Sequence, residues 1–308
     1  MVGLSGAGAV KAVLFDLGGT LWAPFGDRTE DEITREAAVR AARMALSGEG
    51  PEEQVRRVAG ALVSRLTALK PARKVASQLS FADAVFRDED MVKIVQDALE
   101  RASQGSPRGT DGAAWSTAAR AASLGHDRVL SIAEQFGHDL TRHYWLYPET
   151  PRVLSELRSR CAGLVLGIVS NTTIQPHIVD FYLAECGLDK MVDFRILSSE
   201  LGWRKPHPAI YAAALARAGA EAANTVFVGD RSIEDVAGSK RLGMKAILCC
   251  FAKEARWCGG EVARETAPAA VGGAAAGAQE PDATAFALAD VPGLVQALTS
   301  IRPRESGP

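Results

Sequence analysis

Three aspartates are the side chains of this sequence best placed to do chemistry. Asp16 directly follows the apolar run 13–15, and Asp230 and Asp235 come after the apolar run 226–228. A carboxylate can attack a phosphoryl group as a nucleophile. Carboxylate oxygens are also the ligands that a hard cation such as Mg2+ prefers. If both runs form neighbouring parallel strands, the three acids meet at the sheet edge where α/β proteins bind their ligands.

Each aspartate, taken alone, also has a purely structural interpretation. Asp16 can begin an ordinary turn with Gly18 and Gly19. Asp230 can cap the helix that follows it, and Asp235 can be a first-turn acid that the helix dipole stabilises. The combination of three acids after two predicted strands favours metal binding over these alternatives.

A second group of polar side chains is predicted to hold an anion beside these acids. Lys205 directly precedes a proline, so a rigid backbone could aim its ammonium group as a counter-charge. Ser170 and Asn171 end the apolar run 164–169, and Thr20 ends the first turn. Hydroxyl and backbone N–H groups at such places can donate to phosphate oxygens. A solvated lysine and polar strand ends are the structural alternatives.

Four stretches, in this order and context, resemble the haloacid dehalogenase-like (HAD) hydrolase superfamily, whose commonest members are phosphatases. They are Val10–Leu21, Leu166–Asn171, Arg204–Pro206, and Val226–Asp230 followed by Asp235. The resemblance covers the sheet-forming parts, roughly residues 10–25 and 148–250, and is weak over the long segment between them. It is specific for the superfamily but not for a substrate.

The resemblance implies a Mg2+-dependent phosphomonoester hydrolase that acts on a small phosphorylated metabolite. The nucleophile would be Asp16, and water would hydrolyse the aspartyl phosphate that it forms. The predicted catalytic residues are Asp16 and Lys205, and the predicted phosphate-binding residues are Thr20, Ser170, Asn171 and Lys205. The predicted metal ligands are Asp16, the backbone carbonyl of Gly18, Asp230 and Asp235, the last directly or through water.

Gly18 departs from the pattern of most phosphatases in this superfamily, which carry a second aspartate two positions after the nucleophile. Glycine keeps the backbone carbonyl but lacks the side chain that acts as general acid and base. Such help is worth roughly 10²–10⁴ in rate. We therefore expect slow turnover unless another group substitutes, with the smallest loss for good leaving groups such as acyl or aryl phosphates.

Three alternatives stay open at this point. The chain could be a weakly active or non-catalytic relative that binds phosphate or a partner protein, although its acids and Lys205 argue against complete loss. L-2-haloacid dehalogenases also lack the second aspartate, but they need no metal and do not keep the acidic pair. Phosphonatase-like members use an early lysine of the insertion, whereas the first lysine of the segment 27–146 is Lys70.

Strand and helix patterns alternate over residues 147–250 and predict a doubly wound, mainly parallel (Rossmann-like) α/β sheet. The segment 27–146 predicts helices instead, beginning after a capping box at Thr29–Glu32 and ending with a helix over 126–146. The resemblance implies that this insertion is an α-helical cap. The predicted domains are a core of residues 1–26 and 147–308, with 255–280 as a flexible insertion, and a cap of residues 27–146.

The composition is that of an ordinary globular protein: 47% of its 308 residues are hydrophobic and 23% are charged. A net charge of -2 gives no general reason to expect nucleic acid or an anionic membrane as a partner. No apolar run is long enough to span a bilayer, and no secretory signal is recognisable. Five cysteines without zinc-site spacing favour free thiols and a cytoplasmic location. The oligomeric state is left open.

Overall fold

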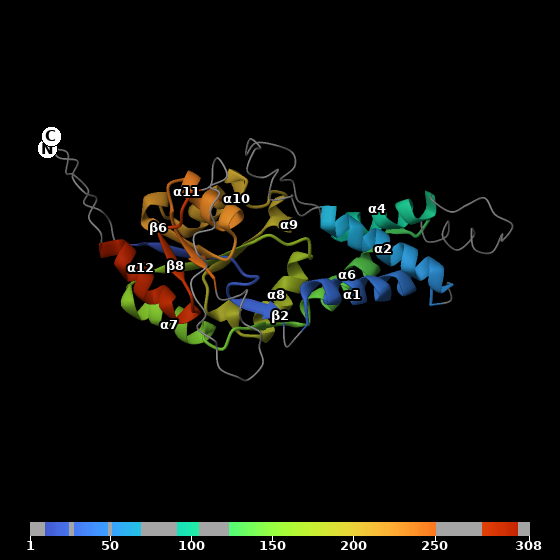
Figure 1. Ribbon diagram of the computed structural model, residues 1–308, viewed down its shortest axis with the longest axis horizontal. Helices are drawn as coiled ribbons and strands as arrows, with labels where there is room; N and C mark the ends of the chain where they lie inside the picture. The colour runs from blue at the N-terminus through green and yellow to red at the C-terminus, as the bar shows by residue number, and fades with distance from the viewer. Residues whose placement is uncertain are drawn as a thin grey trace, which may run out of the picture.

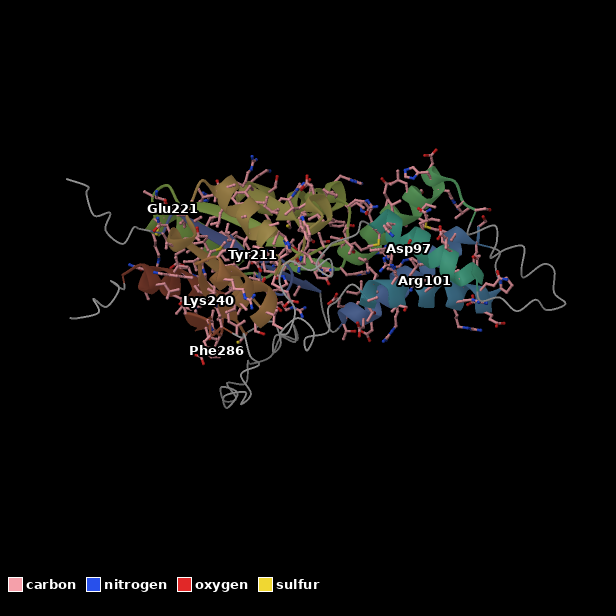
Figure 2. The ribbon with its side chains drawn as sticks, turned by 90° about the horizontal axis from the view of Figure 1, so that it is seen from above. Asp97, Arg101, Tyr211, Glu221, Lys240 and Phe286 are labelled. Carbon is pink, nitrogen blue, oxygen red and sulfur yellow. The ribbon has the colours of Figure 1, made fainter. Side chains whose placement is uncertain are left out.

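The computed structural model of the chain describes residues 10–24, 28–48, 51–68, 91–104, 123–250 and 279–300. An α/β part and a helical part lie side by side along the long axis of the molecule (Figure 1). Seen from above, Tyr211 lies within the α/β part, whereas Asp97 and Arg101 lie on the helical part (Figure 2). The predictions for residues 255–278 and for Cys258 fall outside the described residues.

Six parallel strands form one sheet in the order β5-β4-β1-β6-β7-β8. They are β1 Ala12–Phe15, β4 Val165–Ser170, β5 Phe194–Leu197, β6 Thr225–Gly229, β7 Lys245–Cys249 and β8 Ala283–Ala285. After β1 the chain builds the sheet outwards on one side and then on the other. The reversal makes the carboxyl end of β1 a switch point, where such sheets bind ligands. The predicted doubly wound parallel α/β fold is confirmed.

Helices cover both faces of the sheet, because the central strands are apolar on both sides. The longer ones are α7 Thr150–Arg160, α8 Pro176–Glu185, α10 Pro208–Ala218 and α12 Val291–Ser300. Val13 and Phe15 of β1 share a buried apolar cluster with α7, α8 and α12. Leu14 points to the opposite face and shares a cluster with Tyr211 of α10.

Short elements complete the α/β part between these strands and helices. They are α9 Ser198–Leu201, α11 Gly238–Arg241, a π-helical turn Ser232–Ala237, and 3-10 turns at Leu188–Lys190, Ala222–Asn224 and Leu288–Asp290. The helix that the sequence predicts after Asp230 is divided in the structure into the π-helical turn and α11. The wider turn matters because it carries Asp235.

The helical part consists, among the described residues, of four helices with an apolar core of their own. They are α1 Glu30–Ala45, α2 Glu52–Ala68, α4 Met91–Gln104 and α6 His126–Thr141. The buried face of α1 is mainly alanine, so its neighbours can approach its backbone closely. The predicted capping box is confirmed, since the Thr29 hydroxyl accepts from Glu32 N and the Glu32 carboxylate accepts from Thr29 N.

A short antiparallel pair links the two parts of the molecule. Strand β2 Trp22–Pro24 pairs with β3 Tyr144–Leu146, so the chain leaves the α/β part and returns to it side by side. The helix predicted over 126–146 is therefore wrong at its end, because α6 ends at Thr141. Tyr144 favours a strand, and its ring packs 5.6 Å from the ring of Trp22.

Two further sequence-based predictions can be compared with the described residues. Cys161, Cys186, Cys249 and Cys250 are free thiols, as predicted. Within the described ranges, no helix combines the length and the apolar character that crossing a membrane requires.

Gly167 in β4 offers a test of the packing between the sheet and its edge strand. A Cβ atom at this position would lie 2.5 Å from the ring of Phe194, which is buried. Gly167→Ala is expected to lower the free energy of unfolding by about 1–3 kcal/mol in urea titrations, because the core is overpacked. Gly60→Ala is the control, since Gly60 lies in α2 with open space around it. That variant should gain about 0.5–1 kcal/mol, and equal stability of the two variants would contradict the packing.

Candidate active site

The three aspartates meet at the carboxyl edge of the sheet. Asp16 follows β1 and Asp230 follows β6, which are neighbours in register, with Phe15 beside Val228. One carboxylate oxygen from each of Asp16, Asp230 and Asp235 lies within 4.8 Å of the others, and all three residues are buried. The structure thus brings together acids that are more than 200 positions apart in the sequence.

Two glycines make room for this cluster. A Cβ atom on Gly229 would lie 2.3 Å from the carboxyl group of Asp235, so the π-helical turn can fold back over the end of β6 only because this position is glycine. Gly19 has a φ of +79°, and a Cβ atom there would lie 3.0 Å from Asp230 Oδ2. The sequence predicts a turn at Gly19, but it does not predict that Gly19 and Gly229 each border an acid.

Backbone contacts hold Asp235 in its place. Asp235 Oδ2 accepts a hydrogen bond of 2.9 Å from Arg231 N, and Asp235 N donates to Arg231 O over 2.9 Å. The hydroxyl of Tyr211 donates to the carbonyl of Glu234, the neighbouring residue. These contacts fix the direction of the carboxylate.

Lys205 joins two of the three acids. Its Nζ lies 2.7 Å from Asp16 Oδ1 and 2.7 Å from Asp235 Oδ1, and the residue is 1% exposed. Burial alone would lower the pKa of Lys205, but the two carboxylates outweigh it and raise that pKa. Lys205 therefore stays protonated and positively charged, which its predicted role as a counter-charge requires.

The cluster holds more acidic than basic groups. Burial raises the pKa of Asp235, and the neighbouring charges of Asp16 and Asp230 raise it further, although Lys205 acts in the opposite direction. Arg231 adds a second cation at the rim, with Nε 3.4 Å from Asp230 Oδ2 and half of its side chain exposed. The raised pKa of Asp235 reflects burial and this excess of acidic groups, which a divalent cation bound among the three acids would offset.

Asn171 makes a contact that the sequence does not predict. Its Oδ1 accepts a hydrogen bond of 2.7 Å from Lys205 N, and its Nδ2 donates to Lys205 O over 2.9 Å. Both polar atoms of the side chain thus hold the backbone of Lys205. No local pattern could reveal this role, because the two residues are 34 positions apart.

The other predicted phosphate ligands lie at the same edge of the sheet. Ser170 ends β4, beside β1, and is 6% exposed. Thr20 is fully buried, and its hydroxyl has no hydrogen-bond partner among the described residues. A buried hydroxyl without a partner is uncommon in proteins, and a ligand oxygen could satisfy it.

The sequence profile of haloacid dehalogenase-like hydrolases matches residues 10–243 of this chain. The chain belongs to that family. Phosphoserine phosphatase of Thermus thermophilus is 32% identical over 121 residues, which are 39% of this chain and 47% of the relative. Glyceraldehyde 3-phosphate phosphatase of Methanothermobacter thermautotrophicus is 35% identical over 33% of this chain and 43% of the relative. The chain thus spans about half the length of these relatives.

A solved structure extends the likeness to most of the chain. A 2-haloacid dehalogenase from Pseudomonas syringae is similar over 94% of this chain and 99% of its own, with a TM-score of 0.56 and 24% identity. At this identity the match supports the HAD fold alone.

Gly18 stands where the resemblance in sequence leads us to expect a second aspartate. A Cβ atom there would have no other atom within 4 Å, and the backbone is not in the left-handed region. The site therefore has room for the missing side chain.

Lys205 gives the most direct test of the charge balance in the site. Lys205→Met is expected to lower the free energy of unfolding by about 3–5 kcal/mol in the presence of EDTA, because it leaves buried carboxylates without their counter-charge. Lys240→Met is the matched control. Lys240 pairs with Asp282 over 2.8 Å in a more exposed place, so its loss should cost at most about 1 kcal/mol. Similar losses in both variants would contradict the charge balance.

Proposed function

We propose that the chain is a Mg2+-dependent phosphomonoester hydrolase that acts through an aspartyl phosphate on a small phosphorylated metabolite. The observation that carries the proposal is the cluster of Asp16, Asp230 and Asp235, two of which pair with the ammonium group of Lys205. Membership of the HAD family and the phosphatases among its relatives support the same reaction.

The residues of the cluster fit a magnesium ion. Asp16, Asp230 and Asp235 offer carboxylate oxygens close together, and the carbonyl of Gly18 would add a neutral oxygen ligand. Lys205 balances only part of the acidic charge. When bound, the ion would supply the positive charge that lets an anionic substrate approach an anionic nucleophile.

The side chains around the cluster would have separate roles in the reaction. Asp16 would attack the phosphoryl group, and its contact with Lys205 Nζ orients the carboxylate. Lys205 also faces the charge that develops on the phosphoryl oxygens. Thr20 and Ser170 would donate to these oxygens, while the Asn171 side chain would act by holding Lys205.

We assign residues 27–146 to a cap and residues 1–26 and 147–308 to the core. The cap has its own apolar core in α1, α2, α4 and α6, and both of its connections to the core pass through the β2–β3 pair. Relatives that are phosphoserine and glyceraldehyde 3-phosphate phosphatases favour a small substrate for this chain. The cytoplasmic location stays a prediction from the sequence.

A protein that binds phosphate with little turnover is the second candidate. Gly18 favours it, because no side chain at this position can protonate the leaving alcohol or activate water. Dehalogenation is less favoured, because the three acids around Lys205 suit a metal and a phosphate.

Asp16→Asn should abolish hydrolysis of p-nitrophenyl phosphate, because an amide is no nucleophile for this step. EDTA should abolish the activity of the unmodified protein, and added Mg2+ should restore it. Asp282→Asn, at a partly exposed ion pair with Lys240, is the control and should retain activity. Activity of Asp16→Asn, or activity on 2-haloacids without metal, would overturn the proposal.

Gly18→Asp should raise kcat on alkyl phosphates by up to about 10²–10⁴, since it supplies an acid and base where space exists. The gain on p-nitrophenyl phosphate should be much smaller, because that leaving group needs little protonation. Equal gains on both substrates, or none, would show that the missing side chain does not limit turnover.

A further inference from the structure

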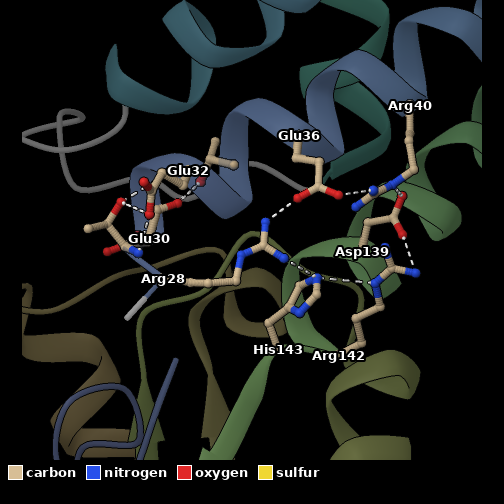
Figure 3. Close-up of polar contacts among 10 residues, drawn as sticks. Arg28, Glu30, Glu32, Glu36, Arg40, Asp139, Arg142 and His143 are labelled. Carbon is tan, nitrogen blue, oxygen red and sulfur yellow. Dashed lines mark hydrogen bonds and ion pairs between the residues drawn. The ribbon is translucent and has the colours of Figure 1, made fainter. Parts of the chain in front are cut away.

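Six side chains form a closed ring of polar contacts where the helical part joins the α/β part (Figure 3). This hinge ring consists of Arg28, Glu36, Arg40, Asp139, Arg142 and His143. They come from the segment before α1, from α1 itself, from α6 and from the segment between α6 and β3. Both connections of the helical part therefore contribute to one ring.

Ion pairs make up most of the hinge ring. Glu36 accepts from Arg28 and, over 2.6 Å, from Arg40 Nη1. Asp139 accepts from Arg40 Nε over 2.8 Å and lies 3.2 Å from Arg142 Nη1. The side chain of Asp139 is 1% exposed, whereas those of the other four are 32–45% exposed. One buried carboxylate thus anchors a ring whose remaining members reach the solvent.

His143 closes the ring, and it does so as a hydrogen-bond acceptor. Its Nε2 lies 3.4 Å from Arg28 Nη1 and 3.3 Å from Arg142 Nε. A guanidinium group can only donate hydrogen bonds. Nε2 must therefore carry no proton, so the imidazole that closes the ring is neutral.

The surroundings of His143 oppose its protonation. Burial lowers the pKa of His143, and the charges of Arg28, Arg142 and Arg40 lower it further, while Glu36 acts in the opposite direction. Hydrogen bonds from Arg40 and Arg28 lower the pKa of Glu36 to about 2, so this carboxylate stays charged in mildly acidic solution. The contact thus contributes fully above the ordinary histidine pKa of about 6.5. It is lost as the pH falls through the lower pKa of His143 in the fold.

We propose that His143 is a positioning residue for the cap. As a neutral acceptor it holds the two connecting segments together through Arg28 and Arg142. Protonation removes the acceptor and places a third cation between two arginines, so the ring opens and the cap is released at its hinge. The proposal rests on the assignment of residues 27–146 as a cap and not on the chemistry at Asp16.

Hydrogen exchange of the amides in β2, β3 and the start of α1 measures the opening of the hinge. Rates of variants and unmodified protein are compared at the same pH, so that intrinsic exchange cancels. At pH about 5 the unmodified protein should exchange about 2- to 10-fold faster than His143→Gln, which keeps a neutral acceptor. At pH about 7.5 the two should agree, because His143 is then neutral.

Two further variants separate the acceptor from the charge. Leucine in His143→Leu provides no hydrogen-bond acceptor and carries no charge. The hinge amides of this variant should therefore exchange faster than those of the unmodified protein at pH about 7.5, where His143 is a neutral acceptor. His177→Gln is the control. His177 joins the same two parts of the molecule through Glu134, at 3.5 Å, and protonation strengthens rather than breaks that contact. Its substitution should leave the acid-induced opening in place.

A nuclear magnetic resonance titration of His143 tests the ring without relying on a destabilised variant. Arg28→Gln should raise the pKa of His143, whereas Arg43→Gln, which affects an exposed pair with Glu52, should not. Equal exchange of the unmodified protein and His143→Gln at both pH values would overturn the proposal. An unchanged His143 titration in Arg28→Gln would also overturn it. Neither hydrogen exchange nor the histidine titration depends on phosphatase activity. A negative result in these experiments can therefore be distinguished from a failure of the proposed function.

Discussion

The ammonium group of Lys205 is the interaction on which the arrangement of the site depends. It is buried and lies 2.7 Å from both Asp16 and Asp235. Without it, three carboxylates would face one another at the end of the sheet, and Asp16 and Asp235 would lose the cation that offsets their desolvation. In the proposed reaction, the same ammonium group would offer charge to an incoming phosphate. The stability of the fold and the proposed catalysis therefore both require a charged Lys205 side chain at this place.

The fold supplies the geometry that this interaction needs. Parallel register sets the end of β1 beside the end of β6, which brings Asp16 next to Asp230. Gly229 lets the π-helical turn carry Asp235 back over the strand. The Asn171 amide then holds the backbone of Lys205 so that its side chain reaches two acids at once. Each step depends on one contact between segments that are distant in the sequence.

The sequence predicts the parts of this arrangement that follow from local patterns. Apolar runs, glycines and a capping box predict five strands of the sheet (β1 and β4–β7), the turn after β1 and the start of α1. Those patterns do not reveal contacts between distant segments. The Asn171–Lys205 pair and the hinge ring are of this kind, as is β3, whose three residues form a strand because they pair with β2. The helix predicted over 126–146 is too long for that reason.

The measurement that tests the central claim most directly is the capture of a phosphorylated protein. Because Gly18 provides no base to activate water, a phosphoryl group transferred to Asp16 should persist long enough to be trapped by acid. Incubation with acetyl phosphate and Mg2+, followed by quenching and peptide mass spectrometry, should locate one phosphoryl group on Asp16, and EDTA should prevent it. Phosphorylation of another residue, or phosphorylation that is independent of the metal, would contradict the account.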